Sequence, residues 1–248
     1  MNLKEFFEEN RKAAIAFSGG VDSAYLIYAA QRYGAKVKAY YVKSAFQPEF
    51  EWRDALCLSA ELNVEMKVLP VNILENCNVT SNPYNRCYYC KKIIFSEIIK
   101  AALEDGFFLI LDGTNASDEE SDRPGMQAIR ELKVRSPLRE CGLTKKEIRK
   151  LSREAGLFTW DKPAYACLAT RIPTGCEITK EKLFKTEQAE EALFRLGFID
   201  FRVRMLGDMA RLQVPADQFE KVLKEKERII AELKKYYSSI LLDLEERG

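Results

Sequence analysis

The chain has 248 residues, 47% of them hydrophobic and 31% charged, which is the composition of an ordinary soluble globular protein with one large domain or two modest ones. Its 39 basic and 38 acidic residues give a formal net charge of +1, which predicts no strong nonspecific attraction to nucleic acid. There is no apolar run of membrane-spanning length and no signal-peptide pattern at Met1–Glu5, so we expect a cytoplasmic protein that does not bind membranes.

The first half of the chain alternates apolar strands with helical periodicity. The fully apolar run 13–17 ends in a glycine turn, as buried parallel strands do. The predicted strands are 13–17, 37–42, 66–71 and 107–111, and the predicted helices are 2–11, 22–33, 49–62 and 87–104. This alternation predicts an α/β fold, a parallel sheet covered by helices on both faces.

A capping box at Thr144 and Glu147 begins the next predicted helix, which ends near Gly156. The stretch from Lys162 to Gly175 is rich in proline and glycine and predicts a boundary, giving domains at 1–165 and 166–248. The remaining predicted elements are a helix at 179–196, strands at 200–206 and 210–214, a helix at 216–236 and a strand at 239–244. These indicate a smaller C-terminal α+β domain.

The segment Ser18–Ser23, Ser-Gly-Gly-Val-Asp-Ser, joins the first strand to its helix. Gly19 and Gly20 permit close approach of a ligand to the backbone, and the free N–H groups and dipole of the helix start favour an anion. The hydroxyls of Ser18 and Ser23 add donors, and Asp22 is suited to hold Mg²⁺ on a pyrophosphate. The alternative is a tight turn without a ligand.

This loop lacks the lysine of a Walker loop and instead resembles that of the PP-loop ATP pyrophosphatases. The segment Asp112–Asn115, Asp-Gly-Thr-Asn, after the fourth predicted strand is also similar to that family, and we include Gly113 among the nucleotide-binding candidates. The resemblance implies that ATP is cleaved between its α and β phosphates. The AMP then activates a carbonyl or carboxyl oxygen for replacement by nitrogen or sulfur.

Four further motifs narrow the resemblance to the LarE family of pyridinium-3,5-biscarboxylic acid mononucleotide sulfurtransferases. They lie at 82–91, 118–125, 162–175 and 202–204. The resemblance implies sulfur insertion into a small-molecule nucleotide, a pyridinium dicarboxylate mononucleotide, during nickel-pincer nucleotide biosynthesis. It also implies a homo-oligomer. The sulfur donor is not identified by the sequence.

The family obtains sulfur in two ways. In one, a single cysteine gives up its own sulfur, and Cys167 matches that cysteine. In the other, three cysteines hold a 4Fe–4S cluster whose open iron carries an extra sulfide. Because Cys87 and Cys90 are present as well, the chain resembles the cluster type, with Cys87, Cys90 and Cys167 as the implied metal ligands.

The chemistry of the cysteines is consistent with this. The chain has seven cysteines and no histidine, so soft-metal chemistry falls to cysteine. Cys87 and Cys90 face one side of a helix start, where the helix dipole, Arg86 and Lys91 favour thiolates. Zinc and a redox disulfide between Cys87 and Cys90 are the alternatives. We expect Cys57 to be buried on a helix and Cys77, Cys141 and Cys176 to lie in loops, with Cys176 a further candidate ligand or sulfur relay.

The implied pyridinium dicarboxylate mononucleotide has a phosphate and carboxylates, which arginine side chains bind well. The candidate arginines within the motifs are Arg171, Arg202 and Arg204. Arg202 and Arg204 share one face of a predicted strand, and a solvated basic face is the alternative. Lys91 and Glu190 complete the candidate catalytic residues with Asp22 and Cys167. For Lys91 and Glu190 the alternative is an ordinary solvated residue on a helix.

The sequence leaves two rival functions open. Some PP-loop enzymes thiolate tRNA, but the near-neutral charge does not favour RNA binding. An ATP-binding regulatory module without catalysis is the rival from another class, and the intact Ser18–Ser23 loop argues against it.

Overall fold

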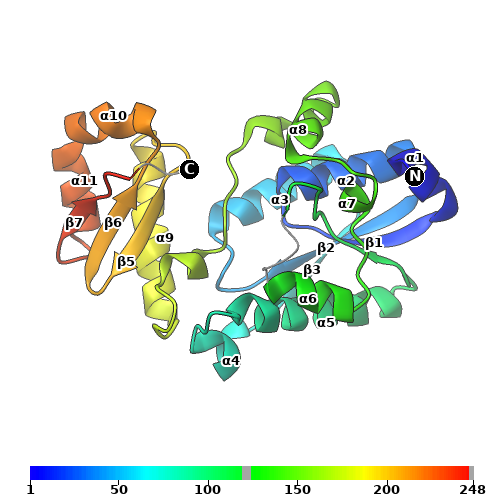
Figure 1. The fold of residues 1–248 in the computed structure, drawn as a ribbon, viewed down its shortest axis with the longest axis horizontal. Helices are drawn as coiled ribbons and strands as arrows, with labels where there is room; N and C mark the ends of the chain where they lie inside the picture. Colours follow the sequence, from blue (N-terminus) through cyan, green and yellow to red (C-terminus); the bar gives the residue numbers. More distant parts are fainter. Residues whose placement is uncertain (119–123, 246–248) are drawn as a thin grey trace. The chain divides into compact units, whose positions relative to one another are not determined.

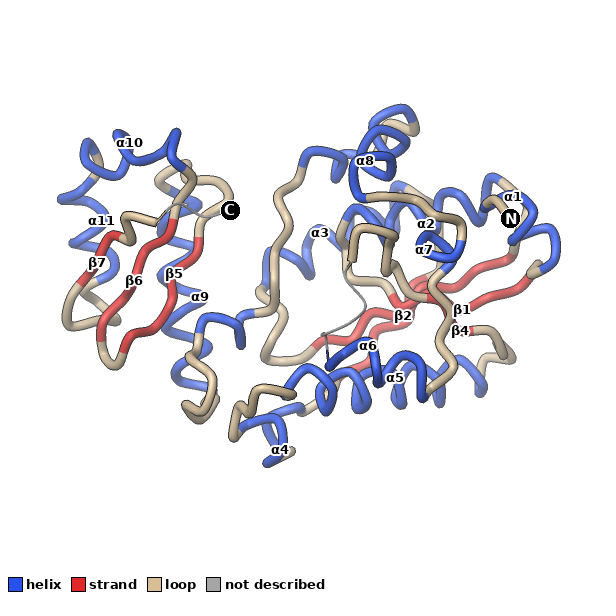
Figure 2. The backbone as a smooth tube through the Cα atoms, in the orientation of Figure 1, coloured by secondary structure: helices blue, strands red, loops and turns tan. Residues whose placement is uncertain are grey.

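The computed structural model describes residues 1–118 and 124–245, which form two compact units (Figures 1 and 2). The first unit comprises Met1–Ile73 and Asn85–Lys162, and the second comprises Leu74–Tyr84 and Pro163–Gly248. The division after Lys162 lies three residues before the expected boundary, inside the proline- and glycine-rich stretch. Residues 119–123 of the motif at 118–125 lie outside the described residues.

The first unit is built on a four-stranded parallel sheet in the order β3-β2-β1-β4. Its strands are β1 (Lys12–Ala16), β2 (Lys36–Lys43), β3 (Met66–Pro70) and β4 (Ile110–Leu111). Ala14 of β1 lies opposite Lys38 of β2 and Ile110 of β4. Because β1 is central, its carboxyl end and that of β4 lie side by side at the point where strand order reverses.

Helices cover both faces of this sheet, which confirms the predicted α/β fold class. Successive residues of β1 alternate between the faces, Ala13 and Ile15 packing into one core and Ala14 into the other. The first core is completed by α1 (Leu3–Glu9), α2 (Val21–Arg32), α3 (Glu49–Glu61), α7 (Pro137–Glu140) and α8 (Lys145–Glu154). The second is completed by α5 (Arg86–Glu104) and α6 (Pro124–Glu131).

The second unit has its own core around a three-stranded mixed sheet in the order β5-β6-β7. The strands are β5 (Arg202–Leu206), β6 (Met209–Gln213) and β7 (Ile240–Leu242), with β5 antiparallel and β7 parallel to β6. Its helices are α4 (Cys77–Thr80), α9 (Lys180–Arg195), α10 (Phe219–Lys224) and α11 (Lys226–Leu233). The short 3-10 turns of the chain are η1 (Ile73–Glu75), η2 (Phe158–Asp161), η3 (Leu168–Arg171) and η4 (Ala216–Gln218).

An early segment of the chain, Leu74–Tyr84, belongs to the second unit although the expected boundary assigned it to the first. Two backbone hydrogen bonds attach it, from Ile178 N to Thr80 O at 2.7 Å and from Gly175 N to Asn82 O at 2.8 Å. The buried amide of Asn82 also donates to Pro173 O at 2.8 Å. These contacts join residues far apart in the sequence, so no pattern within Leu74–Tyr84 itself predicts them.

Several predicted boundaries differ from those of the structure. The strand expected at 107–111 is only Ile110–Leu111, since Phe107 packs into the core and Phe108 is 81% exposed. The helix expected at 216–236 is a 3-10 turn and two helices that meet at Glu225. The first segment is apolar and the second has helical periodicity, so each suggests one continuous element.

Candidate active site

The Ser18–Ser23 loop leaves β1 in a conformation that favours glycine. Gly19 has a φ of +74°, in the left-handed region. A Cβ atom there would lie 3.2 Å from the backbone nitrogen of Ala55 and from the backbone oxygen of Glu51, both on α3. The first glycine of the motif therefore serves both the turn and the close packing of α3.

The two serines of the loop hold each other in place. Ser18 N donates to Ser23 Oγ at 3.3 Å, and Ser23 Oγ donates to Gly20 O at 3.2 Å. Gly20 is the N-cap of α2, and no side chain of the described residues caps this helix. The first N–H groups of a 12-residue helix are thus left for a ligand, and the helix dipole favours an anion.

A second loop, Asp112–Asn115, leaves β4 beside the first. Asp112 is buried and accepts hydrogen bonds from Thr114 Oγ1 and Ser136 Oγ, both at 2.6 Å. A Cβ on Gly113 would lie 3.0 Å from the backbone nitrogen of Ser23, so the absence of a side chain lets this loop contact the first turn of α2. The two loops that resemble those of the PP-loop family therefore lie side by side.

Between them lies a cavity of about 340 Å³, large enough for a nucleotide-sized ligand. Its walls include Ser18, Asp22, Ser23, Gly113 and Lys91. Two polar atoms of its lining, Tyr41 Oη and Asp22 Oδ1, are buried and have no hydrogen-bond partner in the part of the chain that the structure describes. A carboxylate oxygen of this kind fits Mg²⁺, which favours oxygen ligands and binds together with substrate phosphates.

Asp22 has a partner that the sequence did not indicate. Lys145 Nζ, at the start of α8, donates to Asp22 Oδ2 at 2.5 Å. Burial raises the pKa of Asp22, and the nearby ammonium of Lys145 opposes that rise. The backbone of Lys145 is itself anchored, donating to Ser117 Oγ at 2.9 Å. A loop without a lysine of its own is therefore supplied with one from a distant helix.

Lys91 reaches the same cavity from α5. Burial lowers its pKa, while the charges of Asp112, Cys87 and Asp118 oppose the shift. A Cβ on Gly125 of α6 would lie 2.9 Å from Lys91 Cδ, so the glycine leaves room for the lysine to pass. Lys91 therefore lines the same cavity as Ser18 and Ser23.

Cys87 and Cys90 lie in the first turns of α5, as expected. Cys87 is exposed and Cys90 is half-buried. Arg86 Nη2 lies 3.7 Å from Cys87 Sγ. Among the described residues no three Cys, Asp or Glu side chains form a metal-binding group. Cys167, the third expected ligand, belongs to the second unit.

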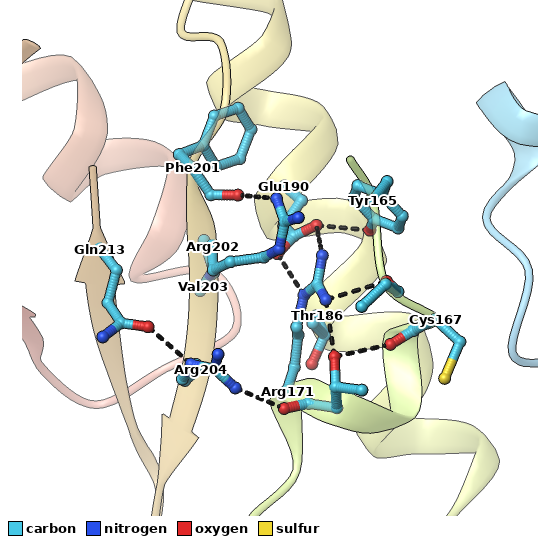
Figure 3. Close-up of polar contacts among 12 residues, drawn as sticks. Tyr165, Cys167, Arg171, Thr186, Glu190, Phe201, Arg202, Val203, Arg204 and Gln213 are labelled. Carbon is cyan, nitrogen blue, oxygen red and sulfur yellow. Dashed lines mark hydrogen bonds and ion pairs between the residues drawn. The ribbon is translucent and has the colours of Figure 1, made fainter. Parts of the chain in front are cut away.

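The remaining candidates form one network in the second unit (Figure 3). Arg171 and Glu190 are each 1% exposed and form an ion pair, with Arg171 Nε 2.7 Å from Glu190 Oε1. Arg202 is buried and Arg204 is half-buried on β5. Burial, followed by the charge of Arg171, lowers the pKa of Arg202 to about 10. Cys167 is half-buried at the N-cap of η3.

The other four cysteines are distributed over both units. Cys57 is exposed on α3, so the expectation that it is buried in the core was wrong. Cys77 begins α4 and is exposed, and Cys141 is half-buried after α7. Cys176 is exposed in the turn after Pro173.

None of the helices in the described ranges is both long and apolar enough to cross a membrane.

Comparison with known proteins agrees with the geometry of the nucleotide site. The family described as "Queuosine biosynthesis protein QueC" matches residues 12–85, which include the Ser18–Ser23 loop. An uncharacterised protein of Synechocystis sp. is 38% identical over 90% of this chain and 84% of its own. An uncharacterised protein of Methanocaldococcus jannaschii is 31% identical over 98% of this chain and 93% of its own.

A third relative carries a functional name. The pyridinium-3,5-bisthiocarboxylic acid mononucleotide synthase of Lactiplantibacillus plantarum is 30% identical over 94% of this chain and 86% of its own. With the parallel sheet and its phosphate loop, these similarities define the class. The chain belongs to the PP-loop ATP pyrophosphatase family, with an adenine nucleotide alpha hydrolase-like fold.

Proposed function

We propose that this protein is an ATP-dependent sulfurtransferase that adenylates a carboxylate of a pyridinium dicarboxylate mononucleotide and inserts sulfur, as a step in nickel-pincer nucleotide biosynthesis. One observation carries the proposal: the similarity to the L. plantarum synthase extends over 94% of the chain and so includes both units. The phosphate loop alone supports the use of ATP but no particular substrate.

The chemistry follows from the poor reactivity of a carboxylate. A carboxylate oxygen of the substrate attacks the α-phosphorus of ATP, and pyrophosphate leaves. A sulfur nucleophile then attacks the activated carbonyl carbon, and the C–O bond to AMP breaks, so that the former carboxylate oxygen departs with AMP. The product is a thiocarboxylate.

In this proposal the residues of the first unit hold ATP. Ser18, Gly19, Gly20, Ser23 and Gly113 surround the phosphates, and the open N–H groups of α2 bind them. The unpartnered Oδ1 of Asp22 would hold Mg²⁺, which would screen the charge of the departing pyrophosphate.

Lys91, in the cavity wall, would neutralise charge that develops on the nucleotide. Arg204 is the half-buried arginine of the second-unit network, and we assign it to the substrate's phosphate or carboxylate.

For sulfur delivery we propose that Cys87, Cys90 and Cys167 bind a 4Fe–4S cluster. The spacing of the first two and their position at a helix start support this, since both features favour thiolate ligands. When bound, a cluster with an open iron would supply the sulfide. The alternative, loss of sulfur from Cys167 itself, would leave that residue lighter by one hydrogen sulfide after turnover, which mass spectrometry detects.

Pyrophosphate release tests the function directly. With ATP and Mg²⁺, we expect release to require the pyridinium dicarboxylate mononucleotide and not to respond to unmodified tRNA. The variant Asp22→Asn should abolish the response, because it removes the charge proposed to bind the metal. Release stimulated by tRNA and not by the mononucleotide would refute the proposal and identify an RNA-thiolating enzyme.

A further inference from the structure

The segment Pro163–Arg171, which we call the cysteine loop, carries Cys167 with little regular structure of its own. Cys167 stands before the short turn η3, and its backbone oxygen accepts hydrogen bonds from Thr170 N at 3.0 Å and Thr170 Oγ1 at 2.9 Å. A four-residue 3-10 turn is too short to hold a loop by itself. Contacts from outside the loop must therefore determine where the thiol lies.

Arg202 and Arg204 of β5 supply such contacts, and Arg171, the last residue of the loop, adds one from within it; each arginine donates to a different backbone oxygen of the cysteine loop. Arg202 Nη2 donates to Ala164 O, Arg171 Nη1 to Ala166 O at 2.9 Å and Arg204 Nη1 to Thr170 O at 2.7 Å. These oxygens lie on both sides of Cys167 in the sequence. Figure 3 shows Arg202 and Arg204 extending from β5 toward this loop and Arg171 folding back over it from its last residue.

Arg171 is also linked to the cysteine through a hydroxyl. Its Nη1 donates to Thr170 Oγ1 at 2.7 Å, and that hydroxyl donates to the backbone oxygen of Cys167. A chain of three groups thus leads from a fully buried guanidinium to the residue that carries the thiol.

Glu190 of α9 holds the network together. Its Oε1 accepts from Arg171 Nε at 2.7 Å and from Val203 N at 3.0 Å. Its Oε2 accepts from Arg171 Nη2 at 3.1 Å and from the hydroxyl of Tyr165. One buried carboxylate therefore connects α9, β5, η3 and the cysteine loop, and both of its oxygens are fully engaged.

Tyr165 adds a second link between the arginines and the loop. Its ring lies 4.4 Å from the guanidinium carbon of Arg171 and 4.9 Å from that of Arg202. Both distances are those of cation–π contacts, which are stronger in a desolvated site. The aromatic ring, its hydroxyl and the two buried cations restrain one another.

We propose that Glu190, Arg171 and Arg202 are positioning residues that set the position of Cys167 by fixing the cysteine loop, and that they do not bind substrate. The geometry favours this role because Arg171 and Arg202 are buried and bonded to the loop, and Glu190 has an internal partner on each oxygen. The inference rests on the proposed function in taking Cys167 as the residue that handles sulfur.

The test uses two variants of the full chain. Glu190→Gln removes the negative charge that pairs with Arg171. Thr170→Val removes only the hydroxyl that links Arg171 to Cys167. This second variant remains informative if Glu190→Gln folds poorly. The control is Arg211→Gln, because Arg211 is an exposed arginine opposite Arg204 in the same sheet and pairs with Asp243.

The first measurement is the alkylation rate of Cys167 by iodoacetamide in chelator-treated, reduced protein, with Cys176 in the same molecule as the reference. We expect both variants to raise the ratio of the Cys167 rate to the Cys176 rate severalfold, because a released loop exposes the half-buried thiol. Arg211→Gln should leave the ratio unchanged. An unchanged ratio in both loop variants would overturn the proposal.

The second measurement is sulfur transfer at varied mononucleotide concentration. Positioning residues should lower kcat and leave KM unchanged, whereas a substrate ligand would raise KM, and that result would also overturn the proposal. Alkylation requires no substrate, so the two proposals can fail separately. If the ratio of the Cys167 to the Cys176 alkylation rate changes in the variants but the protein transfers no sulfur, the inference about the loop holds and the proposed function fails.

Discussion

At the scale of single residues, the pair formed by Lys145 and Asp22 shows most about the nucleotide site. Asp22 belongs to the loop motif, whereas Lys145 comes from a helix 123 residues later in the chain. Their contact, at 2.5 Å, satisfies one oxygen of the carboxylate and leaves the other, Oδ1, without a partner in the described part of the chain. If the Asp22 carboxylate binds Mg²⁺ when ATP binds, the ammonium group of Lys145 lies next to the phosphates of ATP.

We therefore expect Lys145→Met to weaken ATP binding by about tenfold, since hydrogen bonds to charged groups contribute roughly 1.5–3 kcal/mol. AMP binding should change much less, because AMP lacks the β and γ phosphates. Isothermal titration calorimetry with both nucleotides measures the difference. Lys146→Met is the matched control, because Lys146 is the exposed neighbour on the same helix. Equal losses for ATP and AMP would contradict this role.

The same variant has a pH signature. Lys145 lowers the pKa of Asp22, so its removal raises that pKa further above the ordinary value. Mg²⁺ binds the ionised form of the Asp22 carboxylate. We therefore expect Mg²⁺-dependent ATP binding by Lys145→Met to be lost at a higher pH than in the unmodified protein, as the pH is lowered. Lys146→Met should leave it in place.

At the scale of elements, the start of α8 connects helix stability to the nucleotide site. Thr144 caps the helix by accepting from Glu147 N, and Glu147 reaches back to Thr144 N at 2.8 Å. The hydrogen bonds to Thr144 lower the pKa of Glu147. This capping box, visible in the sequence, also fixes the residue that carries Lys145.

Removing the cap by Thr144→Ala should cost about 1 kcal/mol of unfolding free energy. It should also weaken ATP binding, because the helix start that presents Lys145 loosens. Thr179→Ala is the control, since Thr179 caps α9 in the second unit by accepting from Lys182 N at 3.2 Å. Urea denaturation and calorimetry should show similar stability losses but weaker ATP binding only in Thr144→Ala. Equal ATP affinities in the two variants would refute the connection.

Long elements were predictable and short ones were not. Helices α2, α3, α5 and α9 lie within about two residues of their expected bounds, because each has a long apolar stripe and recognisable ends. Helices α4, α6 and α7 were missed. Their four to eight residues are too few for a periodic signal, and such short helices depend on tertiary packing.

At the scale of the whole molecule, the proposed sulfur chemistry draws on both units. Cys87 and Cys90 belong to the first and Cys167 to the second. In the proposed cluster each of the three thiolates is a ligand, so we expect the loss of any one of them to remove the cluster.

We expect anaerobically purified protein to be brown and to contain iron and acid-labile sulfide. Replacing Cys87, Cys90 or Cys167 by alanine should each remove most of both, because two thiolates bind a 4Fe–4S cluster poorly. Cys57→Ala is the control, since Cys57 is an exposed cysteine on α3. Elemental analysis that found zinc, or a colourless protein with normal sulfur transfer, would refute the cluster.

The sequence by itself determined the features whose physics is local. The Ser18–Ser23 loop was readable because an apolar strand, two glycines and a helix start follow one another within a few residues. The α/β class followed from the alternation of strands and helices. The capping box and the position of Cys87 and Cys90 at a helix start were likewise set by neighbouring residues.

Only the tertiary structure decided which distant residues meet. It brought Lys145 to Asp22, placed Gly113 against the first turn of α2 and joined Leu74–Tyr84 to the second unit. It also gave the arginines, expected to face a substrate, hydrogen bonds to the backbone around Cys167. Such contacts depend on how distant segments pack and on which buried hydrogen-bond donors still need an acceptor. A motif within one segment contains no information about either.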